Sequence, residues 1–317
     1  MTTLRTEKIW KNGKLIAWEN ATIHVMSHAV HYGTSWFEGV RCYKTERGAE
    51  VFRLSDHVHR LFNSCKIYRT DIPFTENEIA QGILETIRVN KLESCYIRPL
   101  VFRGFGSLGV NPLKAPVDTY LMVWEWGSYL GEEALADGVD VCTSSWQRAA
   151  PNTFPSIAKA GGNYLNSGLI KMEAAVNGFA EGIALDVHGH LSEGSGENLF
   201  LIQDGKVYTP SLSSSILGGI TRSSVLTLLR ERNVEVIEKT LPREMLYTAD
   251  EIFFTGTAAE VTPIRSVDRI QVGTAGRGPI TEQVQSDFFD YVYGRVDDRH
   301  DWMTPVHAPS ASTTPVG

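Results

Sequence analysis

The sequence SIAKAGGNY (residues 156–164) places one lysine, Lys159, among small residues. A lysine that forms a Schiff base needs a neutral amine with open space around its tip, and alanine and glycine neighbours leave such space. Taken alone, Lys159 would be read as a solvated surface charge, as most lysines are. A second segment, LSEGSGENLF (residues 191–200), follows downstream and carries Glu193 and Glu197. Together the two segments indicate a pyridoxal phosphate site with Lys159 as its catalytic residue.

Carboxylate and phenol groups near this lysine are candidates for contacts with the cofactor ring. A carboxylate at the pyridine nitrogen keeps that nitrogen protonated, and the protonated ring accepts the electrons released when the substrate loses its α-proton. Glu193 suits this position, but Glu197 is its rival, and spacing alone does not choose between them. Tyr164 follows Lys159 by five residues and is in reach of the phenolic oxygen of the ring.

Two glycine-containing turns are candidates for phosphate binding. The segment LGGITR (residues 217–222) precedes an amphipathic helical pattern, so its backbone N–H groups and the Thr221 hydroxyl would face an anion at a helix N-terminus. The segment FFTGTAAE (residues 253–260) has the same character at the end of a strand. Arg60 lies opposite the apolar stripe of its own predicted helix, and its guanidinium suits a phosphate.

Composition narrows the class of protein. The chain has 317 residues, 42% of them hydrophobic, and a net charge of −7 without a dense Lys/Arg run, so we expect neither nucleic acid nor membrane as a partner. The first residues lack the apolar core of a signal peptide, and no apolar run reaches membrane-span length, which predicts a cytoplasmic protein.

Cysteine and histidine usage point the same way. The four cysteines are widely separated and are expected to be reduced. The histidines lack acidic or cysteine partners at metal spacing, so no metal site is predicted.

Local patterns predict a mixed α/β protein with two domains. Residues 1–127 are expected to form a smaller N-terminal domain, 128–137 an interdomain loop, and 138–303 a larger C-terminal domain that carries the lysine. Residues 304–317 are rich in Pro, Ser and Thr and are expected to be disordered. Asn12-Gly13 predicts a hairpin turn, whereas Ser55 and Thr75 are expected to cap helices. Residues 95–103 read as a strand with Tyr96 and Arg98 on one face.

The ordered set of motifs resembles the branched-chain amino acid aminotransferases, members of the fold type IV pyridoxal phosphate enzymes. The matching segments are HYGTS (31–35), FEGVR (37–41), YIRP (96–99), LGVNP (108–112), AKAGGNY (158–164), EGSGEN (193–198), more loosely residues 242–246, and TGTAAE (255–260). The resemblance implies the two-domain architecture of D-amino acid aminotransferase, with the cofactor between the domains, and at least a homodimer.

The resemblance also implies a role for individual residues. Lys159 would be the Schiff-base lysine and proton shuttle, with Glu193 at the pyridine nitrogen and Tyr164 near the ring oxygen. Tyr96, with the backbone around Thr257 and Ala258, would bind the substrate α-carboxylate, and Arg98 the distal carboxylate of glutamate. The implied phosphate ligands are Arg60, Ile220, Thr221 and Thr257, with Gly256 in the same turn. The implied side-chain pocket comprises Tyr32, Phe37, Trp126 and Tyr129, with Val110 from a neighbouring subunit.

The implied reaction moves the amino group of L-leucine, L-isoleucine or L-valine to 2-oxoglutarate. The alternatives are a fold type IV transaminase of D-amino acids or (R)-amines, an aminodeoxychorismate lyase, and a metabolite-binding protein without catalysis. Trp36 and the segment RGFGS (103–107) depart from the expected pattern. Trp36 would either fill a core gap or narrow the pocket, and the loop that begins at Arg103 would shape the substrate entrance.

Overall fold

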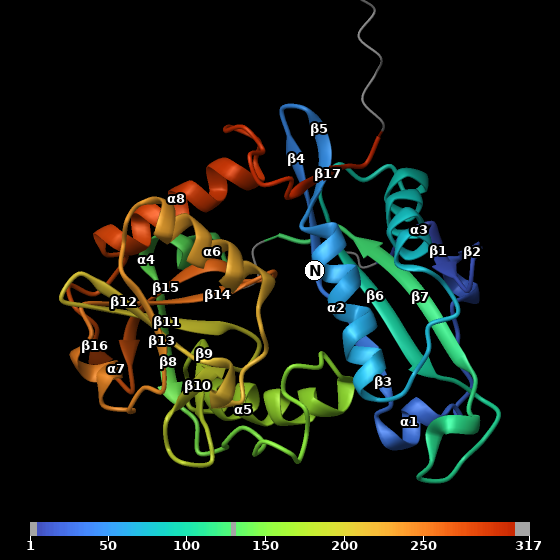
Figure 1. Cartoon of the computed structure of the whole chain (residues 1–317), viewed down its shortest axis with the longest axis horizontal. Helices are drawn as coiled ribbons and strands as arrows, with labels where there is room; N and C mark the ends of the chain where they lie inside the picture. Colours follow the sequence, from blue (N-terminus) through green and yellow to red (C-terminus); the bar gives the residue numbers. More distant parts are fainter. Residues whose placement is uncertain (1–4, 128–130, 308–317) are drawn as a thin grey trace, which may run out of the picture.

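The computed structural model describes residues 5–127 and 131–307. These residues form two β-sheets, each covered by helices, and the mixed α/β class expected from the sequence is confirmed. Figure 1 shows the sheets as neighbouring domains, with helix α2 (Leu54–Ile67) on the side of the first domain that faces the second. No helix in the described ranges combines the length and apolar character needed to cross a membrane.

The first sheet runs in the order β17-β5-β4-β6-β7-β1-β2, with β3 paired to β6, and its neighbouring strands are antiparallel. Its strands are β1 (Lys8–Lys11), β2 (Lys14–Ala17), β3 (Ser35–Phe37), β4 (Val40–Thr45), β5 (Gly48–Phe52), β6 (Cys95–Arg103), β7 (Val117–Trp124) and β17 (Met303–Pro305). Its helices are α1 (His28–Tyr32), α2 and α3 (Glu76–Val89). Helices α2 and α3 bury an apolar cluster against this sheet.

Local signals set two of the three turns and caps that the sequence predicted. Asn12 (φ 47°) and Gly13 (φ 88°) form the β1–β2 turn with the positive φ values that Asn-Gly tolerates. Thr75 and Glu78 form a capping box at the start of α3. The prediction that Ser55 caps α2 is wrong: Arg53 is the N-cap residue, with φ 52°. Its backbone N–H donates to Trp302 O and its guanidinium to Ser224 Oγ, and these tertiary contacts set where the helix begins.

The second sheet runs in the order β10-β9-β8-β15-β14-β11-β12-β13, with β16 paired to β15, and mixes parallel and antiparallel pairs. Its strands are β8 (Val139–Thr143), β9 (Glu181–Leu185), β10 (Leu191–Gly194), β11 (Asn198–Gln203), β12 (Lys206–Pro210), β13 (Val236–Lys239), β14 (Glu251–Gly256), β15 (Glu260–Val267) and β16 (Ile270–Gln271). Its helices are α4 (Glu132–Asp137), α5 (Tyr164–Val176), α6 (Ile220–Glu231), α7 (Met245–Thr248) and α8 (Pro279–Val292).

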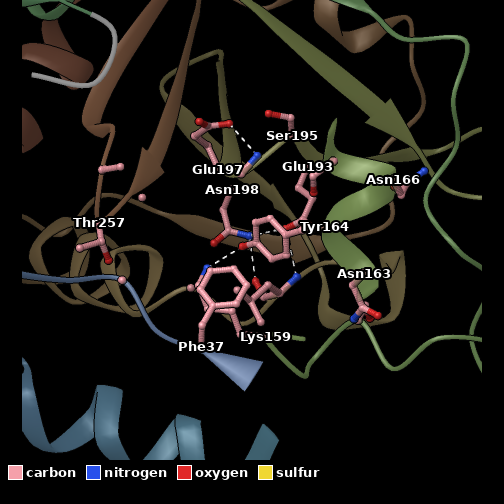
Figure 2. A pocket seen from close by; sticks show the side chains of 18 of the residues that line it. Phe37, Lys159, Asn163, Tyr164, Asn166, Glu193, Ser195, Glu197, Asn198 and Thr257 are labelled. Atoms are coloured by element: carbon pink, nitrogen blue, oxygen red, sulfur yellow. Dashed lines mark hydrogen bonds between the residues drawn. The ribbon is translucent and has the colours of Figure 1, made fainter. Parts of the chain in front are cut away.

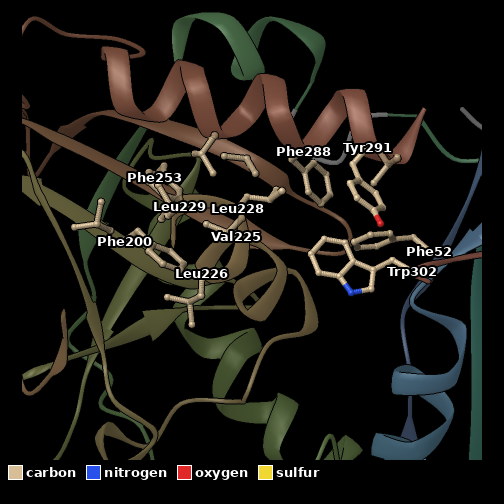
Figure 3. Packing of buried hydrophobic residues seen from close by; sticks show 14 of the residues in the cluster. Phe52, Phe200, Val225, Leu226, Leu228, Leu229, Phe253, Phe288, Tyr291 and Trp302 are labelled. Carbon is tan, nitrogen blue, oxygen red and sulfur yellow. The ribbon is translucent and has the colours of Figure 1, made fainter. Parts of the chain in front are cut away.

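The central strands of the second sheet are buried on both faces. Phe200 of β11 packs into a cluster beneath α6 and α8, whereas its neighbour Leu201 packs into a different cluster on the other face, as the two-residue period requires. The first of these clusters also contains Phe52 of β5 and Trp302 (Figure 3). The two domains therefore share one apolar core in addition to having cores of their own.

The C-terminal segment and the interdomain segment differ from their predictions. Residues 304–306 were expected to be disordered, but Thr304 and Pro305 belong to β17, which pairs with β5, and Val306 is fully buried. Polar composition does not reveal that the edge strand β5 supplies hydrogen-bond partners to this segment. Residues 132–137 were expected to be loop but form α4, in which Ala134 is buried in the second domain.

Trp302 tests the shared core. Its indole contacts Phe52 and Tyr291 at ring-centroid distances of 5.8 and 4.8 Å, and the side chain is buried. We expect Trp302→Ala to lower the free energy of unfolding by about 3–5 kcal/mol, the usual cost of removing a buried aromatic ring. Urea denaturation followed by circular dichroism measures this loss. The control is Trp146→Ala, an exposed tryptophan, and an equal loss in both variants would contradict the assignment.

Candidate active site

A cavity of about 500 Å³ lies between the two domains. Most of the side chains singled out in the sequence converge on it, although they come from separate strands, helices and turns of both sheets. Those that line it are Phe37, Arg60, Tyr96, Arg98, Trp126, Lys159, Tyr164, Glu193, Ile220, Thr221, Gly256, Thr257 and Ala258. Figure 2 shows Lys159, Tyr164 and Phe37 close together, with Glu193 on the side of Tyr164 and Thr257 across the pocket.

Lys159 is the amine at the centre of this cavity. Its Nζ donates to the Tyr164 hydroxyl at 2.5 Å and lies 5.1 Å from the centre of the Phe37 ring. The lysine backbone is held by the first domain: Ser64 Oγ accepts from its N–H, and its carbonyl accepts from the N–H of Phe37. The amine is therefore positioned by both domains.

The small residues around Lys159 have a packing role that differs from the one inferred from sequence. A Cβ atom on Gly161 would lie 2.2 Å from Ser35 Oγ, and Ala160 is buried in a bridge with Trp36. Alanine and glycine here allow the lysine loop to approach β3 closely. The predicted open space around the amine comes instead from the interdomain cavity.

Glu193 and Glu197 both reach the cavity but have different surroundings. Glu193 accepts hydrogen bonds from Asn198 Nδ2 at 3.2 Å and Leu217 N at 3.0 Å, and Arg148 Nε lies 3.3 Å from its carboxylate. Burial raises the pKa of Glu193, while the Arg148 charge opposes that rise. Lys159 also lowers this pKa, which places the carboxylate in the electrostatic field of the amine.

Glu197 faces another carboxylate. Its Oε2 accepts from the N–H of Gly196 at 3.0 Å, and burial together with the negative charge of Glu181 raises its pKa to about 8. A carboxyl group that holds its proton near neutral pH cannot serve as an ionised partner for a pyridinium ring. This difference favours Glu193 over its rival.

The N-terminus of α6 lies at the cavity and is a candidate anion site. The helix begins at Ile220, which lines the cavity with Thr221, and within the described ranges no side-chain hydrogen bond caps it. Its first backbone N–H groups therefore have no side-chain acceptor there and are available to an anion. Arg60 Nη1 donates to Gly218 O at 2.9 Å, which holds the guanidinium beside this turn. Thr257, in the turn between β14 and β15, lines the same cavity. Both turns that were predicted to bind phosphate thus line the same cavity.

A mixed aromatic and basic wall forms the other side of the cavity. The rings of Tyr96 and Trp126 are 4.4 Å apart. The Arg98 guanidinium carbon lies 4.7 Å from the centre of the Phe37 ring, and its Nε has no hydrogen-bond partner among the described residues. The shared strand face predicted for Tyr96 and Arg98 is confirmed, because both side chains line the cavity.

Two described residues of the predicted substrate pocket are not brought to this cavity. Tyr32 and Val110 are exposed and lie outside its lining. The His28 ring joins their two segments, since it contacts Tyr32 at 4.6 Å and bonds the Gly109 carbonyl at 2.7 Å. Tyr129 lies outside the described residues.

Trp36 and Arg103 do not shape the cavity of their own chain. Trp36 is 1% exposed and packs against Tyr68, just after α2, because alternation along β3 turns Phe37 to the cavity and Trp36 away. Arg103 is buried and donates to the carbonyls of Ala115 and Arg69. The hypothesis that its loop sets the substrate entrance therefore has no support from this side chain.

Sequence reasoning missed several residues that hold the site. Arg148 is buried, donates to the carbonyls of Gly194 and Ser195 and pairs with Glu193, yet it lies in none of the quoted motifs. Glu38 lies within the motif FEGVR and bonds Arg60, but was given no role. The four cysteines are free and buried, and the described residues contain no group of three or more potential metal ligands.

The proteins that are similar to this chain in sequence and structure are aminotransferases, in agreement with this site. Residues 35–267 match the family "Amino-transferase class IV", so the chain belongs to the class IV aminotransferases, and its fold is fold type IV. The branched-chain-amino-acid aminotransferase of Salmonella typhimurium is 51% identical, over 97% of this chain and all of the relative. The crystal structure of the Escherichia coli branched-chain amino acid aminotransferase superposes with a TM-score of 0.94 at 50% identity, over 96% of this chain and 100% of that one.

A third similar protein is a holo-form. The branched-chain amino acid aminotransferase from Thermobaculum terrenum, in its PLP-form, has a TM-score of 0.90 and 35% identity to this chain, over 96% of this chain and 100% of that one. The resemblance drawn from the motifs is thus confirmed at the level of the family.

Glu197 gives a prediction about pH. The folded state keeps its proton up to about pH 8, whereas the unfolded chain releases it near the usual carboxyl pKa, so stability falls as the pH rises between about pH 5 and pH 8. Glu197→Gln removes this proton exchange. We expect the melting temperature of the wild type to fall more than that of the variant across this range, with little difference at pH 5. Thermal scans across the range, with exposed Glu93→Gln as the control, measure the two slopes; equal slopes would contradict the assignment.

Proposed function

We propose that this chain is a pyridoxal phosphate-dependent aminotransferase that moves the amino group of L-leucine, L-isoleucine or L-valine to 2-oxoglutarate. The observation that carries the proposal is the convergence of a lysine amine, a buried carboxylate and an uncapped helix N-terminus on one interdomain cavity. The similar proteins of Salmonella typhimurium and Escherichia coli are branched-chain aminotransferases, which supports the choice of branched-chain substrates.

The residues present fit the cofactor at each of its functional groups. Arg60, Thr257 and the N-terminus of α6 at Ile220 and Thr221 offer donors for a phosphate, with Gly256 in the same turn as Thr257. Glu193 supplies a carboxylate for the ring nitrogen, and Tyr164 a hydroxyl for the ring oxygen. When bound, the cofactor supplies an electron sink for the substrate α-carbon.

Lys159 and Tyr164 would handle the proton. The Nζ of Lys159 would move the proton from the substrate α-carbon to the C4′ carbon of the cofactor in one half-reaction, and in the reverse direction in the other. Tyr164 holds that nitrogen through its hydroxyl, 2.5 Å away, and the Phe37 ring limits its movement.

One pocket would bind both kinds of substrate. Tyr96 and the backbone at Thr257 and Ala258 would bind the α-carboxylate. The aromatic wall formed by Phe37 and Trp126 accepts an aliphatic side chain, whereas the Arg98 guanidinium would pair with the distal carboxylate of glutamate or 2-oxoglutarate. We propose that Tyr129 completes this wall.

We further propose that the enzyme is a homodimer or a higher homo-oligomer in the cytoplasm. Tyr32 and Val110 are exposed on their own chain, 47% and 85% respectively, so they are free to reach the pocket of a second copy. The free, buried cysteines suit a reducing compartment.

A half-reaction screen tests the substrate assignment. The purified holoenzyme is mixed with L-leucine, L-valine, L-glutamate, D-alanine and (R)-1-phenylethylamine, and the visible absorbance of the bound cofactor is followed. We expect L-leucine, L-valine and L-glutamate to remove this band. A response to D-alanine or the (R)-amine alone would support the alternative transaminases, and pyruvate release from aminodeoxychorismate would support the lyase.

Lys159→Ala tests the role of the amine. We expect turnover to fall by about 10³-fold or more, because both the Schiff base and the proton shuttle are lost. Borohydride reduction followed by mass spectrometry should find cofactor attached to the wild type and not to the variant. The control is Lys66→Ala, an exposed lysine of α2 outside the cavity, which should behave like the wild type. Retained turnover in Lys159→Ala would refute the assignment.

A further inference from the structure

Glu38 is a fully buried carboxylate to which the proposed function gives no role. It follows β3 directly, next to Phe37, and its side chain is 0% exposed. A charge in such a place is tolerated only when it is paired and hydrogen-bonded. Its partners are Arg60, which donates through Nε at 2.7 Å and Nη2 at 2.8 Å, and His57, which contacts it through Nδ1 at 2.8 Å.

Glu38 and Arg60 form a bidentate ion pair, in which each carboxylate oxygen accepts from a different guanidinium nitrogen. This geometry fixes the plane as well as the position of the Arg60 guanidinium. The third contact of Arg60, from Nη1 to Gly218 O at 2.9 Å, joins the guanidinium to the turn before α6. In the described part of the chain, these bonds use three of the five N–H groups of the guanidinium. The remaining N–H groups are left for an anion in the cavity that Arg60 lines.

His57 supports the same carboxylate without adding a second charge. Burial lowers the pKa of His57, so the ring is neutral near neutral pH and donates through Nδ1 to the carboxylate. Burial opposes ionisation of Glu38, yet the charge and hydrogen bonds of Arg60 bring its pKa well below the usual range. The cluster is therefore one anion, one cation and one neutral donor.

The backbone of Glu38 ties this cluster to the rest of the site. Its N–H donates to Pro99 O at 2.9 Å, between Arg98 and Leu100 of β6, and the neighbouring N–H of Phe37 donates to Lys159 O at 3.1 Å. A movement of Glu38 would shift the Arg60 guanidinium relative to the loop that carries Lys159.

We infer that Glu38, supported by His57, is the positioning residue that aims the Arg60 guanidinium at the phosphate of the cofactor. The inference rests on the proposed function, because it requires pyridoxal phosphate in this cavity. Glu38 touches neither the reacting atoms nor the cofactor in this account and acts only through Arg60. Its loss should weaken recognition of the phosphate group and spare recognition of the ring.

Paired titrations separate these two effects. Full-length protein depleted of cofactor is titrated with pyridoxal 5'-phosphate and, separately, with pyridoxal, which lacks the phosphate; protein fluorescence and visible absorbance report binding. For Glu38→Gln we expect the affinity for pyridoxal 5'-phosphate to fall by about tenfold or more, because one of the two charge-assisted hydrogen bonds that orient Arg60 is lost. The affinity for pyridoxal should stay within about twofold of the wild-type value.

Further variants separate position from charge. Glu38→Asp keeps the negative charge but shortens the side chain, so it should also lower the affinity for pyridoxal 5'-phosphate. If only the charge of residue 38 mattered, this variant would bind the compound as tightly as the wild type. His57→Asn keeps a donor near the Nδ1 position and should bind better than His57→Leu. These His57 variants carry the same test if Glu38→Gln does not fold. The matched control is Glu50→Gln, a buried glutamate paired with Arg47 in the same domain and outside the cavity.

The outcomes distinguish this inference from the proposed function. Binding of pyridoxal 5'-phosphate by the wild type with unchanged or tighter binding by both Glu38 variants would overturn the role of Glu38 and leave the proposed function standing. Equal losses for pyridoxal and its phosphate would also overturn it, because they would indicate general damage to the pocket. Failure of the wild type to bind either compound would overturn both.

Discussion

The site depends on hydrogen bonds that fasten the backbone of Lys159 to the first domain. Its N–H donates to Ser64 Oγ at 3.0 Å and its carbonyl accepts from Phe37 at 3.1 Å, while Ala160 forms a bridge with Trp36. The lysine belongs by chain order to the second half of the protein, yet the first half sets its position. Everything that must meet its amine is therefore sensitive to how the two domains dock. The shared aromatic cluster around Phe52 and Trp302 keeps that docking fixed at a distance from the site.

The buried carboxylates near the cavity are paired with arginine side chains. Glu193 faces Arg148 and Glu38 faces Arg60. Across the domain boundary, Glu260 at the start of β15 forms an ion pair with Arg41 and accepts a hydrogen bond from the Tyr43 hydroxyl. Such pairs add little net stability, because desolvation offsets much of their attraction, but each one fixes an orientation that water-exposed charges would not hold. Glu197 is the exception that keeps its proton instead, since Glu181 already carries the local negative charge. The site thus fixes the charge and direction of its polar groups before any ligand arrives.

Short-range features were predictable because they depend on neighbours in the chain. The Asn12-Gly13 turn and the Thr75 capping box follow from side-chain chemistry within a few residues, and the common face of Tyr96 and Arg98 follows from strand alternation. The errors have long-range causes. Ser55 lost the cap position because Arg53 is bound by Trp302 and Ser224, and residues 304–306 are ordered because β5 offers an open edge. Neither partner can be identified from the local pattern.

Motif order identified the family and many of the side chains that line the cavity, because a lysine among small residues, a downstream carboxylate and two glycine-containing turns are chemical requirements written in residue types. Assembly in space decided the rest. Only the fold shows that Glu193 pairs with Arg148 while Glu197 faces Glu181. It also shows that Trp36 turns into the core and that Glu38 holds Arg60. The reason is physical: residue type states what a group can do, whereas its burial, its charge state and its direction depend on neighbours that are distant in the chain.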